Sequence, residues 1–393
     1  MQEFEYVIIG GGMAADAAVG GIRRRDKSGE ILVASEEFFP PYQRPPLSKK
    51  LWMDMRLEEI WLNTWQKQPH THLYLNAVAS GIDPQAHTVT FADGRQVAYQ
   101  KLLLATGARS RRLPGDSQQA FYVGTAAEHV RLWQALQDPR RVMVAGGGFI
   151  GAEMAAALSQ RGHEVTWIMV EPSPFANFLP PGLAERVTAA YREHGVSFTT
   201  GAAIDELSDT STGIAARLQS GMTLEADLAV VGVGVEPRDE LAQAAGLKTH
   251  SGIVVDEYLR TSNPSIWAAG DVALTHGRAT MHEDHAVTQG RAAGQNMAGA
   301  EKPYQHRSFY YSDLYQFGYE AMGDCSTQHE VVEDWVVPYE EGVVYYLSQG
   351  RVVGVLNWNV WDGMGKAEQL IEADRQFSPD ELRGQIRNSE GDQ

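Results

Sequence analysis

The chain has 393 residues, enough for two or three domains of ordinary size, and its 43% hydrophobic and 21% charged residues are typical of a folded globular protein. Its 33 basic and 50 acidic side chains give a formal net charge of −17, which argues against nucleic acid and anionic membrane surfaces as partners. Cys325 is the only cysteine, so neither an internal disulfide nor a relay between two protein thiols can form.

The apolar stretches of the chain are short. Residues 228–231 are an example, far below the ~20 residues that span a bilayer, so no membrane span is expected. At the N-terminus the chain enters an apolar strand within a few residues, which leaves no room for a secretory leader. We therefore expect a cytoplasmic protein.

A strand, helix, strand pattern occurs twice along the chain. Each time, a short apolar run is followed by a helical pattern and then by a second apolar run, the βαβ rhythm of a parallel sheet. The segments are 6–10, 13–25 and 31–34 in the first case, and 141–145, 149–161 and 164–170 in the second. The repetition predicts an α/β protein with two Rossmann-like dinucleotide-binding domains in tandem.

Three arginines, Arg23, Arg24 and Arg25, stand where the first helix should end. They could form a binding patch, or they could be cations that complement the negative end of the helix dipole. The structural interpretation is favoured over the binding patch.

A glycine-rich motif follows the first predicted strand. Gly10, Gly12 and Ala15 fit G-x-G-x-x-A, in which small residues let the strand turn sharply into a helix whose N-terminal amides can hold a pyrophosphate. Glu36, 24 residues after Gly12, is expected to end the next strand, where a carboxylate can accept hydrogen bonds from ribose hydroxyls. The first domain is therefore predicted to bind a dinucleotide.

The second motif is a full G-x-G-x-x-G formed by Gly146, Gly148 and Gly151. Glu171, 23 residues after Gly148, is expected to end the following strand. The alternative, that the glycines only make tight turns, would have to hold twice with correctly placed acids. Two bound dinucleotides are therefore predicted.

Two other segments are consistent with a flavin in the first domain. Residues 102–107 and 266–271 each end a strand, and Asp271 is expected to face the cofactor. The helix predicted at 283–298 would bring its positive end, about half a charge, near the flavin and favour an anionic reduced form.

Beyond residue 307 the pattern becomes β-like. Segments 342–347 and 351–356 predict a hairpin, residues 364–374 a closing helix, and the polar tail 378–393 a frayed end. The predicted division is an FAD-binding domain in two parts, an NADH-binding domain between them, and a C-terminal α+β domain with an antiparallel sheet. The boundaries are 1–118, 119–238, 239–307 and 308–393.

The motifs together resemble the two-dinucleotide flavoprotein reductases, and among them the apoptosis-inducing factor family and the ferredoxin reductases of bacterial oxygenase systems. The resemblance covers nearly the whole chain. Its blocks are 41–49, 146–153, 270–271, 282–286 with 290–291, 311–314 with 318–320, and 354–359, the last being more like apoptosis-inducing factor.

The resemblance implies that FAD and NADH are the cofactors, and that Lys49 and Glu153 form a pair beside the flavin. A lysine in a dry pocket needs such a partner. Lys49, Glu153, His282 and Tyr311 are the predicted catalytic residues. The predicted FAD ligands are Gly10, Gly12, Ala15, Glu36, Arg44, Lys49, Ala105, Thr106, Gly107, Asp271, Glu283 and Tyr311, and those of NADH are Gly146, Gly148, Phe149, Ile150, Gly151, Glu171 and Gly234.

Three positions depart from the family pattern or leave a role open. Tyr311 stands where the family more often has a tryptophan against the flavin, and Gly124 where relatives often carry an arginine that helps hold FAD. For His282 a place near the nicotinamide and a purely structural role are equally open. No metal site is expected.

The sequence therefore predicts an FAD-dependent NADH oxidoreductase whose electrons leave to an external acceptor, because no protein disulfide can receive them. The acceptor could be a small iron–sulfur protein of the ferredoxin or rubredoxin kind, a quinone or oxygen. The alternative is an NADH-sensing flavoprotein whose long-lived reduced state controls partner binding or formation of a homodimer.

Overall fold

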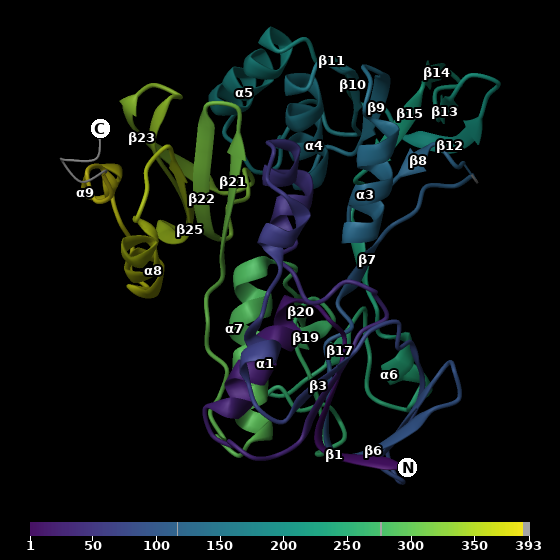
Figure 1. Cartoon of the computed structure of the whole chain (residues 1–393). Helices are drawn as coiled ribbons and strands as arrows, with labels where there is room; N and C mark the ends of the chain where they lie inside the picture. The colour runs from purple at the N-terminus through teal and green to yellow at the C-terminus, as the bar shows by residue number, and fades with distance from the viewer. Residues whose placement is uncertain (116, 276, 388–393) are drawn as a thin grey trace. The chain divides into compact units, whose positions relative to one another are not determined.

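The computed structural model describes residues 1–393 apart from 116, 276 and 388–393, and the chain divides into two compact units (Figure 1). Unit 1 consists of Met1–Pro46, Arg56–Arg109 and Val235–His306. Unit 2 consists of Leu47–Met55, Ser110–Gly234 and Arg307–Gln393. The four-part division into domains stays a prediction.

Unit 1 is built on a seven-stranded sheet with the order β3-β2-β1-β6-β5-β4, in which β18 also pairs with β6. The pairs among β1, β2, β3, β6 and β18 are parallel, while β4 and β5 form an antiparallel edge. The strands are β1 (Gln2–Ile9), β2 (Ile31–Ala34), β3 (Thr71–Tyr74), β4 (Ala79–Asp83), β5 (Thr88–Phe91), β6 (Gln96–Leu104) and β18 (Ile266–Ala268).

Both faces of this sheet are buried. Along β1, Val7 and Ile9 belong to one cluster of buried hydrophobic residues, while Tyr6 and Ile8 belong to another. Because successive side chains of a strand point to opposite faces, the two clusters are the cores on either side of the sheet.

Two helices of unit 1, α1 (Met13–Arg23) and α7 (Glu283–Met297), lie side by side (Figure 1). They pack backbone against backbone, because a Cβ added at Gly290 would lie 2.2 Å from the Ala14 carbonyl oxygen and one at Gly294 would lie 2.2 Å from that of Ala18. The remaining elements are α2 (Thr64–Lys67), α6 (Glu240–Ala244), the 3₁₀ turn Leu57–Ile60, the pair β7 (Ala108–Ser110) and β16 (Val235–Pro237), and a small sheet of β17 (Ile253–Val254), β19 (Ala273–Thr275) and β20 (Arg278–Ala279).

Unit 2 contains a parallel sheet with the order β11-β10-β9-β15-β8, and a small antiparallel sheet of β12, β13 and β14. The strands of the parallel sheet are β8 (Ala120–Phe121), β9 (Arg141–Ala145), β10 (Glu164–Ile168), β11 (Ser197–Thr199) and β15 (Leu228–Val231). The other elements are α3 (Ala126–Ala135), α4 (Phe149–Gln160), α5 (Pro181–Glu193), β12 (Ile204–Asp209), β13 (Ile214–Leu218), β14 (Thr223–Ala226) and the 3₁₀ turn Lys50–Trp52.

The C-terminal part of unit 2 is an antiparallel sheet with the order β21-β22-β25-β24-β23, accompanied by two helices (Figure 1). Its alternate residues Val343, Tyr345 and Leu347 pack into one buried cluster with Ala367 and Leu370 of the first of these helices. The elements are β21 (Phe309–Leu314), β22 (Phe317–Gly323), β23 (Glu330–Val337), β24 (Glu341–Ser348), β25 (Arg351–Trp358), α8 (Met364–Glu372) and α9 (Pro379–Leu382).

The predicted fold class is confirmed, but several element ends are shorter than expected. The first helix ends at Arg23 and the strand expected at 164–170 ends at Ile168, so Glu36 and Glu171 stand beyond their strands rather than at their ends. Arg23 has a structural role, but not as a cation at the end of the helix dipole: its buried guanidinium donates to four backbone carbonyls that lie outside α1, those of Asp26, Gly29, Pro69 and His70.

The expectation of a frayed tail is wrong for residues 378–387. Ser378 caps α9 through the backbone N–H of Glu381, and Leu382 and Ile386 are buried against the C-terminal sheet. Arg387 then forms an ion pair of 2.6 Å with Asp334. Residues 388–393 lie outside the described part of the chain.

A membrane span needs a helix of sufficient length and apolarity. In the described ranges, no helix is both long enough and apolar enough to span a bilayer.

Candidate functional site

The first glycine-rich turn lies in unit 1, between β1 and α1. Gly10 has a φ of +127° and donates its N–H to the Ala34 carbonyl at 2.8 Å. A Cβ at Gly10 would lie 2.0 Å from the Ala105 carbonyl oxygen, so only glycine fits there. A Cβ at Gly12 would meet only the Arg44 guanidinium, at 3.8 Å. The amino end of α1 therefore faces open space beside a cation.

The second turn lies in unit 2, between β9 and α4, and has nearly the same geometry. Gly146 has a φ of +111° and donates its N–H to the Ile168 carbonyl at 2.9 Å. A Cβ at Gly146 would lie 2.3 Å from the Gly232 carbonyl oxygen, while a Cβ at Gly148 would meet nothing within 4 Å. Gly151 allows α4 to pack closely against the turn, because a Cβ added at this position would lie 2.0 Å from the Gly146 carbonyl oxygen.

Both turns fit the pyrophosphate of a dinucleotide. Each presents the N-terminal amides of a helix, which carry the positive end of its dipole, to open space. The N-cap residues Gly12 (φ −91°, ψ −171°) and Gly148 (φ −85°, ψ −172°) adopt the same extended conformation.

Glu36 follows β2 by two residues and is held by Arg238. The Arg238 Nη2 donates to Glu36 Oε2 at 2.7 Å, and this hydrogen bond lowers the pKa of the carboxyl. Arg238 is itself fixed, because its carbonyl accepts from the Thr106 hydroxyl at 2.7 Å and its N–H donates to the Gly107 carbonyl at 2.9 Å. The predicted residues Thr106 and Gly107 thus position a cation that sequence reasoning missed.

Glu171 follows β10 by three residues and has a different environment. Its Oε2 is buried and has no hydrogen-bond partner within the described parts of the chain. The same oxygen lies 2.4 Å from the position of a Cβ at Gly147, so the carboxylate sits directly over the second turn. An unsatisfied buried acceptor at this place fits the donor hydroxyls of a ribose.

Arg44 and Asp271 form the charged part of the site in unit 1. The Arg44 guanidinium donates to Glu37 Oε1 at 2.7 Å and to the Tyr42 hydroxyl at 3.2 Å. Burial raises the pKa of Asp271 to about 6, and the nearby Arg44 lowers it in part. The arginine is therefore fixed by its own partners, while the Asp271 carboxyl is buried with a raised pKa.

The turn that carries Asp271 is held by α7. Gln289 is fully buried and its Oε1 accepts from the Gly270 N–H at 2.7 Å, a contact that the sequence did not predict. Glu283 begins α7 and His282 is its N-cap residue. His285, one turn on, is buried and its pKa is lowered to about 4 by that burial, so it is neutral at ordinary pH.

The predicted pair of Lys49 and Glu153 is present in unit 2. Their Nζ and Oε1 atoms are 3.1 Å apart, and their side chains are only 12% and 7% exposed. Glu153 also accepts from the hydroxyls of Ser48 at 2.5 Å and Ser312 at 2.6 Å. Three donors thus stabilise the carboxylate, as a buried charge requires.

Lys49 also connects this pair to Tyr311. Its Nζ donates to the Tyr311 carbonyl at 3.2 Å and lies 4.6 Å from the centre of that ring, a cation–π contact. The Tyr311 side chain is 42% exposed. The two predicted catalytic side chains are therefore in contact, and Tyr311 is partly exposed.

Phe149, at the start of α4, belongs to an aromatic cluster of unit 2. Its ring centre is 5.7 Å from Phe175, 5.8 Å from Phe178 and 5.7 Å from Tyr310. Ile150 borders the second turn, where a Cβ at Gly232 would lie 3.3 Å from it.

Cys325 is not suited to redox chemistry. The thiol is buried, and burial raises its pKa to about 12, so it remains protonated at ordinary pH. A thiol becomes a nucleophile only as the thiolate. A cysteine-based electron relay within the chain is therefore excluded by count and by environment.

The fold and the two turns define an oxidoreductase class that works with two dinucleotides. The sequence matches the family described as "Pyridine nucleotide-disulphide oxidoreductase" over residues 4–290, and "Apoptosis-inducing factor, mitochondrion-associated, C-term" over residues 293–337 and 326–373. The chain therefore belongs to the pyridine nucleotide-disulphide oxidoreductase family.

Three relatives illustrate the similarity. A putative mitochondrial apoptosis-inducing factor 1 of Drosophila melanogaster is 28% identical over 95% of this chain, which spans only 64% of that protein's length. A ferredoxin reductase from Rhodopseudomonas palustris is 29% identical with a TM-score of 0.88, covering 96% of each chain. A putidaredoxin reductase, in a covalent complex with putidaredoxin, is 27% identical with a TM-score of 0.88, covering 97% of this chain and 95% of that chain.

Proposed function

We propose that this protein oxidises NADH and passes the electrons, through FAD, to an acceptor outside the chain. The observation that carries the proposal is the pair of glycine turns, which offer two pyrophosphate sites of almost equal geometry in one chain. Cys325 cannot receive electrons as part of a disulfide, so the acceptor must be external.

The residues of unit 1 are proposed to hold FAD. The amides after Gly12 and the Arg44 guanidinium would bind its pyrophosphate, Glu36 its ribose and Asp271 its ribitol. Gly10, Ala15, Ala105, Thr106 and Gly107 shape the turns, and Glu283 begins the helix beside them. When bound, FAD would supply the hydride acceptor, which no protein side chain offers.

The residues of unit 2 are proposed to hold NADH. The amides after Gly148 would bind its pyrophosphate and Glu171 the adenosine ribose, while Phe149 would contact the nicotinamide end. Ile150 and Gly151 shape this turn, and Gly234, with a φ of +100°, closes the loop after β15.

The Lys49 and Glu153 pair is proposed to position the reacting rings rather than to transfer protons. Glu153 is already saturated by Lys49, Ser48 and Ser312, so it has little capacity left to act as a base. Tyr311 would offer its exposed ring as an aromatic wall, held in place by Lys49. Replacing His282 and measuring the rate of flavin reduction by NADH would test whether this residue takes part.

Small iron–sulfur proteins are the acceptors we favour, with quinone and oxygen as alternatives. One relative is named a ferredoxin reductase and another is bound to putidaredoxin. Because ferredoxins are often acidic, the net charge of −17 requires a local basic surface for such a partner. We also propose a cytoplasmic location and the domain boundaries 1–118, 119–238, 239–307 and 308–393.

Stopped-flow absorbance tests the proposal. The purified yellow protein is reduced with NADH, and the bleached flavin is then mixed in turn with a ferredoxin, a quinone or oxygen. Fast reduction followed by fast reoxidation with one of the three is expected. Absence of bound flavin, or reduction no faster than with free FAD, would contradict the proposed function.

A second candidate function follows from the C-terminal domain. The match to the apoptosis-inducing factor C-terminal family covers β21 to α8. In this interpretation the reduced protein persists with bound NAD⁺ and forms a homodimer or binds a partner. Sedimentation velocity before and after addition of NADH distinguishes the two functions. Only an NADH-sensing protein is expected to change its assembly mass on reduction, and its flavin should be reoxidised slowly.

A further inference from the structure

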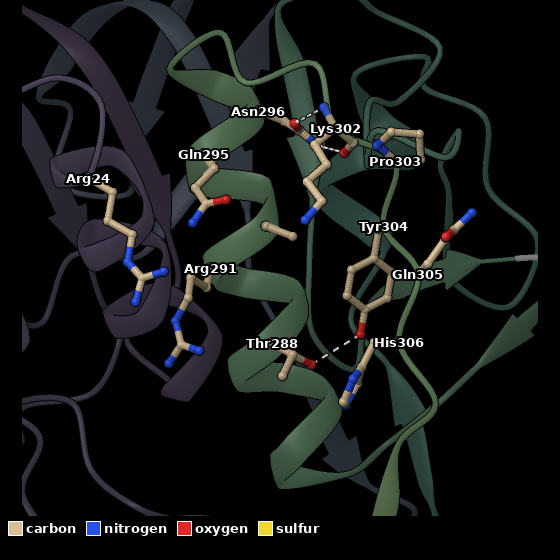
Figure 2. Close-up of a pocket in the computed structure, with 11 residues that line it drawn as sticks. Arg24, Thr288, Arg291, Gln295, Asn296, Lys302, Pro303, Tyr304, Gln305 and His306 are labelled. Atoms are coloured by element: carbon tan, nitrogen blue, oxygen red, sulfur yellow. Dashed lines mark hydrogen bonds between the residues drawn. The ribbon is translucent and has the colours of Figure 1, made fainter. Parts of the chain in front are cut away.

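A basic pocket lies in unit 1 at the carboxyl end of α1, where no dinucleotide is assigned. It has a volume of about 280 Å³ and is lined by Arg24, by Thr288, Arg291 and Gln295 of α7, and by the segment 302–306 that follows α7. Figure 2 shows Arg24 and Arg291 on one side of it and Lys302 on the segment opposite.

The three cations of this pocket have no anionic partner within the described residues. Arg24, Arg291 and Lys302 each lie outside every ion pair of that part of the chain. Arg24 is the C-cap residue of α1, and the neighbouring Arg25 donates to the carbonyls of Ala298 and Gly299 after α7. Three cations thus line one pocket of a protein whose net charge is −17, and an anion bound between them would reduce their mutual repulsion.

The pocket is also preorganised. Buried Asn296 fixes the segment opposite α7, since its Nδ2 donates to the Lys302 carbonyl at 2.9 Å and its Oδ1 accepts from the Lys302 N–H at 2.9 Å. The Tyr304 N–H donates to the Glu257 carbonyl at 2.7 Å, and its hydroxyl lies 3.2 Å from that of Thr288 (Figure 2). The wall is therefore built before a ligand arrives.

We propose that this pocket binds a small phosphate-bearing anion at a site separate from both dinucleotides. Guanidinium forks and an ammonium suit the oxygens of a phosphate, and Thr288 and Gln295 add neutral donors. Its volume lies near the lower limit of ~300 Å³ for ligand pockets, which favours an anion of a few atoms over a nucleotide. Arg24 is twelve residues from Gly12, so the α1 helix separates this site from the first turn by ~18 Å.

Calorimetric titration of the FAD-loaded protein with inorganic pyrophosphate tests the proposal. Saturating NAD⁺ blocks the second glycine turn, and ionic strength is held constant. One binding site is expected, and Arg24→Gln and Lys302→Gln should each weaken it about tenfold, the loss expected for one charge-assisted hydrogen bond. Both side chains are exposed, so the variants should fold and keep their flavin.

Three controls make the test specific. Lys248→Gln removes another exposed lysine of unit 1 and should leave the affinity for pyrophosphate unchanged, and Lys302→Arg should retain most of that affinity. Malonate, a dianion without phosphate geometry, should bind more weakly than pyrophosphate. No binding in the unmodified protein, equal weakening by Lys248→Gln, or equal binding of malonate would overturn the proposal.

Discussion

The two glycine turns differ in how the protein treats the acid beside each one. Glu36, near the first turn, accepts from Arg238 and its side chain is 40% exposed. Glu171, over the second turn, keeps a buried oxygen without a partner in the described residues. The backbone of the two turns is nearly the same, so the difference lies in the side chains around them.

This difference indicates how much each carboxylate would contribute to binding of its proposed ligand. In unit 1 the carboxylate is satisfied before any ligand binds, so a ligand there gains less from it and depends more on the helix amides and Arg44. In unit 2 the unsatisfied oxygen of Glu171 costs free energy until a donor arrives, which makes that contact a larger part of binding.

The largest expected effect is the loss of stability when the first glycine turn is changed. Gly10→Ala places a Cβ 2.0 Å from a carbonyl oxygen at a φ of +127°, and should destabilise unit 1 by about 3 kcal/mol or more. Gly12→Ala meets only Arg44 at 3.8 Å and should cost about 1 kcal/mol or less. Urea unfolding of both variants with the flavin removed measures the difference; equal stabilities would show that the turn geometry is not the constraint.

Glu153 is a third carboxylate to compare with Glu36 and Glu171, and it accepts from the most side chains of the three. Lys49→Met leaves it with only the Ser48 and Ser312 hydroxyls and should destabilise the protein by about 2–3 kcal/mol, less than for a fully stranded charge. Reduction by NADH should also slow, because the Tyr311 backbone and ring lose the ammonium that contacts them.

Lys50→Met is the matched control, since Lys50 is the exposed neighbour of Lys49. Thermal unfolding and stopped-flow reduction of both variants separate the effects. If Lys49→Met behaved like Lys50→Met in both measurements, Lys49 would be only a surface charge.

Valine substitutions in the open space over each turn test whether FAD binds at the first turn and NADH at the second. Gly12→Val should fold but be purified without yellow colour, because the side chain fills the approach to the α1 amides. Gly148→Val should keep its flavin and bind NADH at least about tenfold more weakly. Absorbance at purification and NADH titration provide the readouts, and a yellow Gly12→Val protein would refute the assignment of the first turn to FAD.

Much of this fold could be predicted because its signals are local. The spacing of Gly10, Gly12 and Ala15 is imposed by a strand that must turn into a helix, and the second motif repeats it. The packed tail also had a readable signal, the capping box from Ser378 to Glu381, which the polar composition of the segment obscured.

The partners of the predicted residues could not be found in the same way. Ser48 and Ser312 reach Glu153 across 105 and 159 residues of sequence, and Arg238 reaches Glu36 across 202. A serine or arginine at such a distance carries no local pattern, because only the folded chain brings it to the carboxylate. The sequence therefore predicted the charged residues of the site better than the hydrogen bonds that hold them.

The last prediction concerns the choice between NADH and NADPH, and it tests the role of the unsatisfied Glu171 oxygen. The 2′-phosphate of NADPH would bring a second negative charge to the unsatisfied Glu171 carboxylate, and residues 172–181 contain no lysine or arginine to offset it. Two unit charges at ~4 Å repel by about 4 kcal/mol at an effective dielectric near 20, before screening and relaxation. Since Glu171 is partly exposed, we expect a preference for NADH of about tenfold to a hundredfold, some 1.4–2.8 kcal/mol.

Glu171→Ala combined with Ser173→Arg should narrow or reverse this preference for NADH. In contrast, Glu185→Ala, which removes an exposed carboxylate of α5 in the same unit, should leave the preference unchanged. The measurement is the rate of flavin reduction at equal low concentrations of the two nucleotides. Equal rates in the unmodified protein would mean that the oxygen left unsatisfied at Glu171 does not face the adenosine ribose.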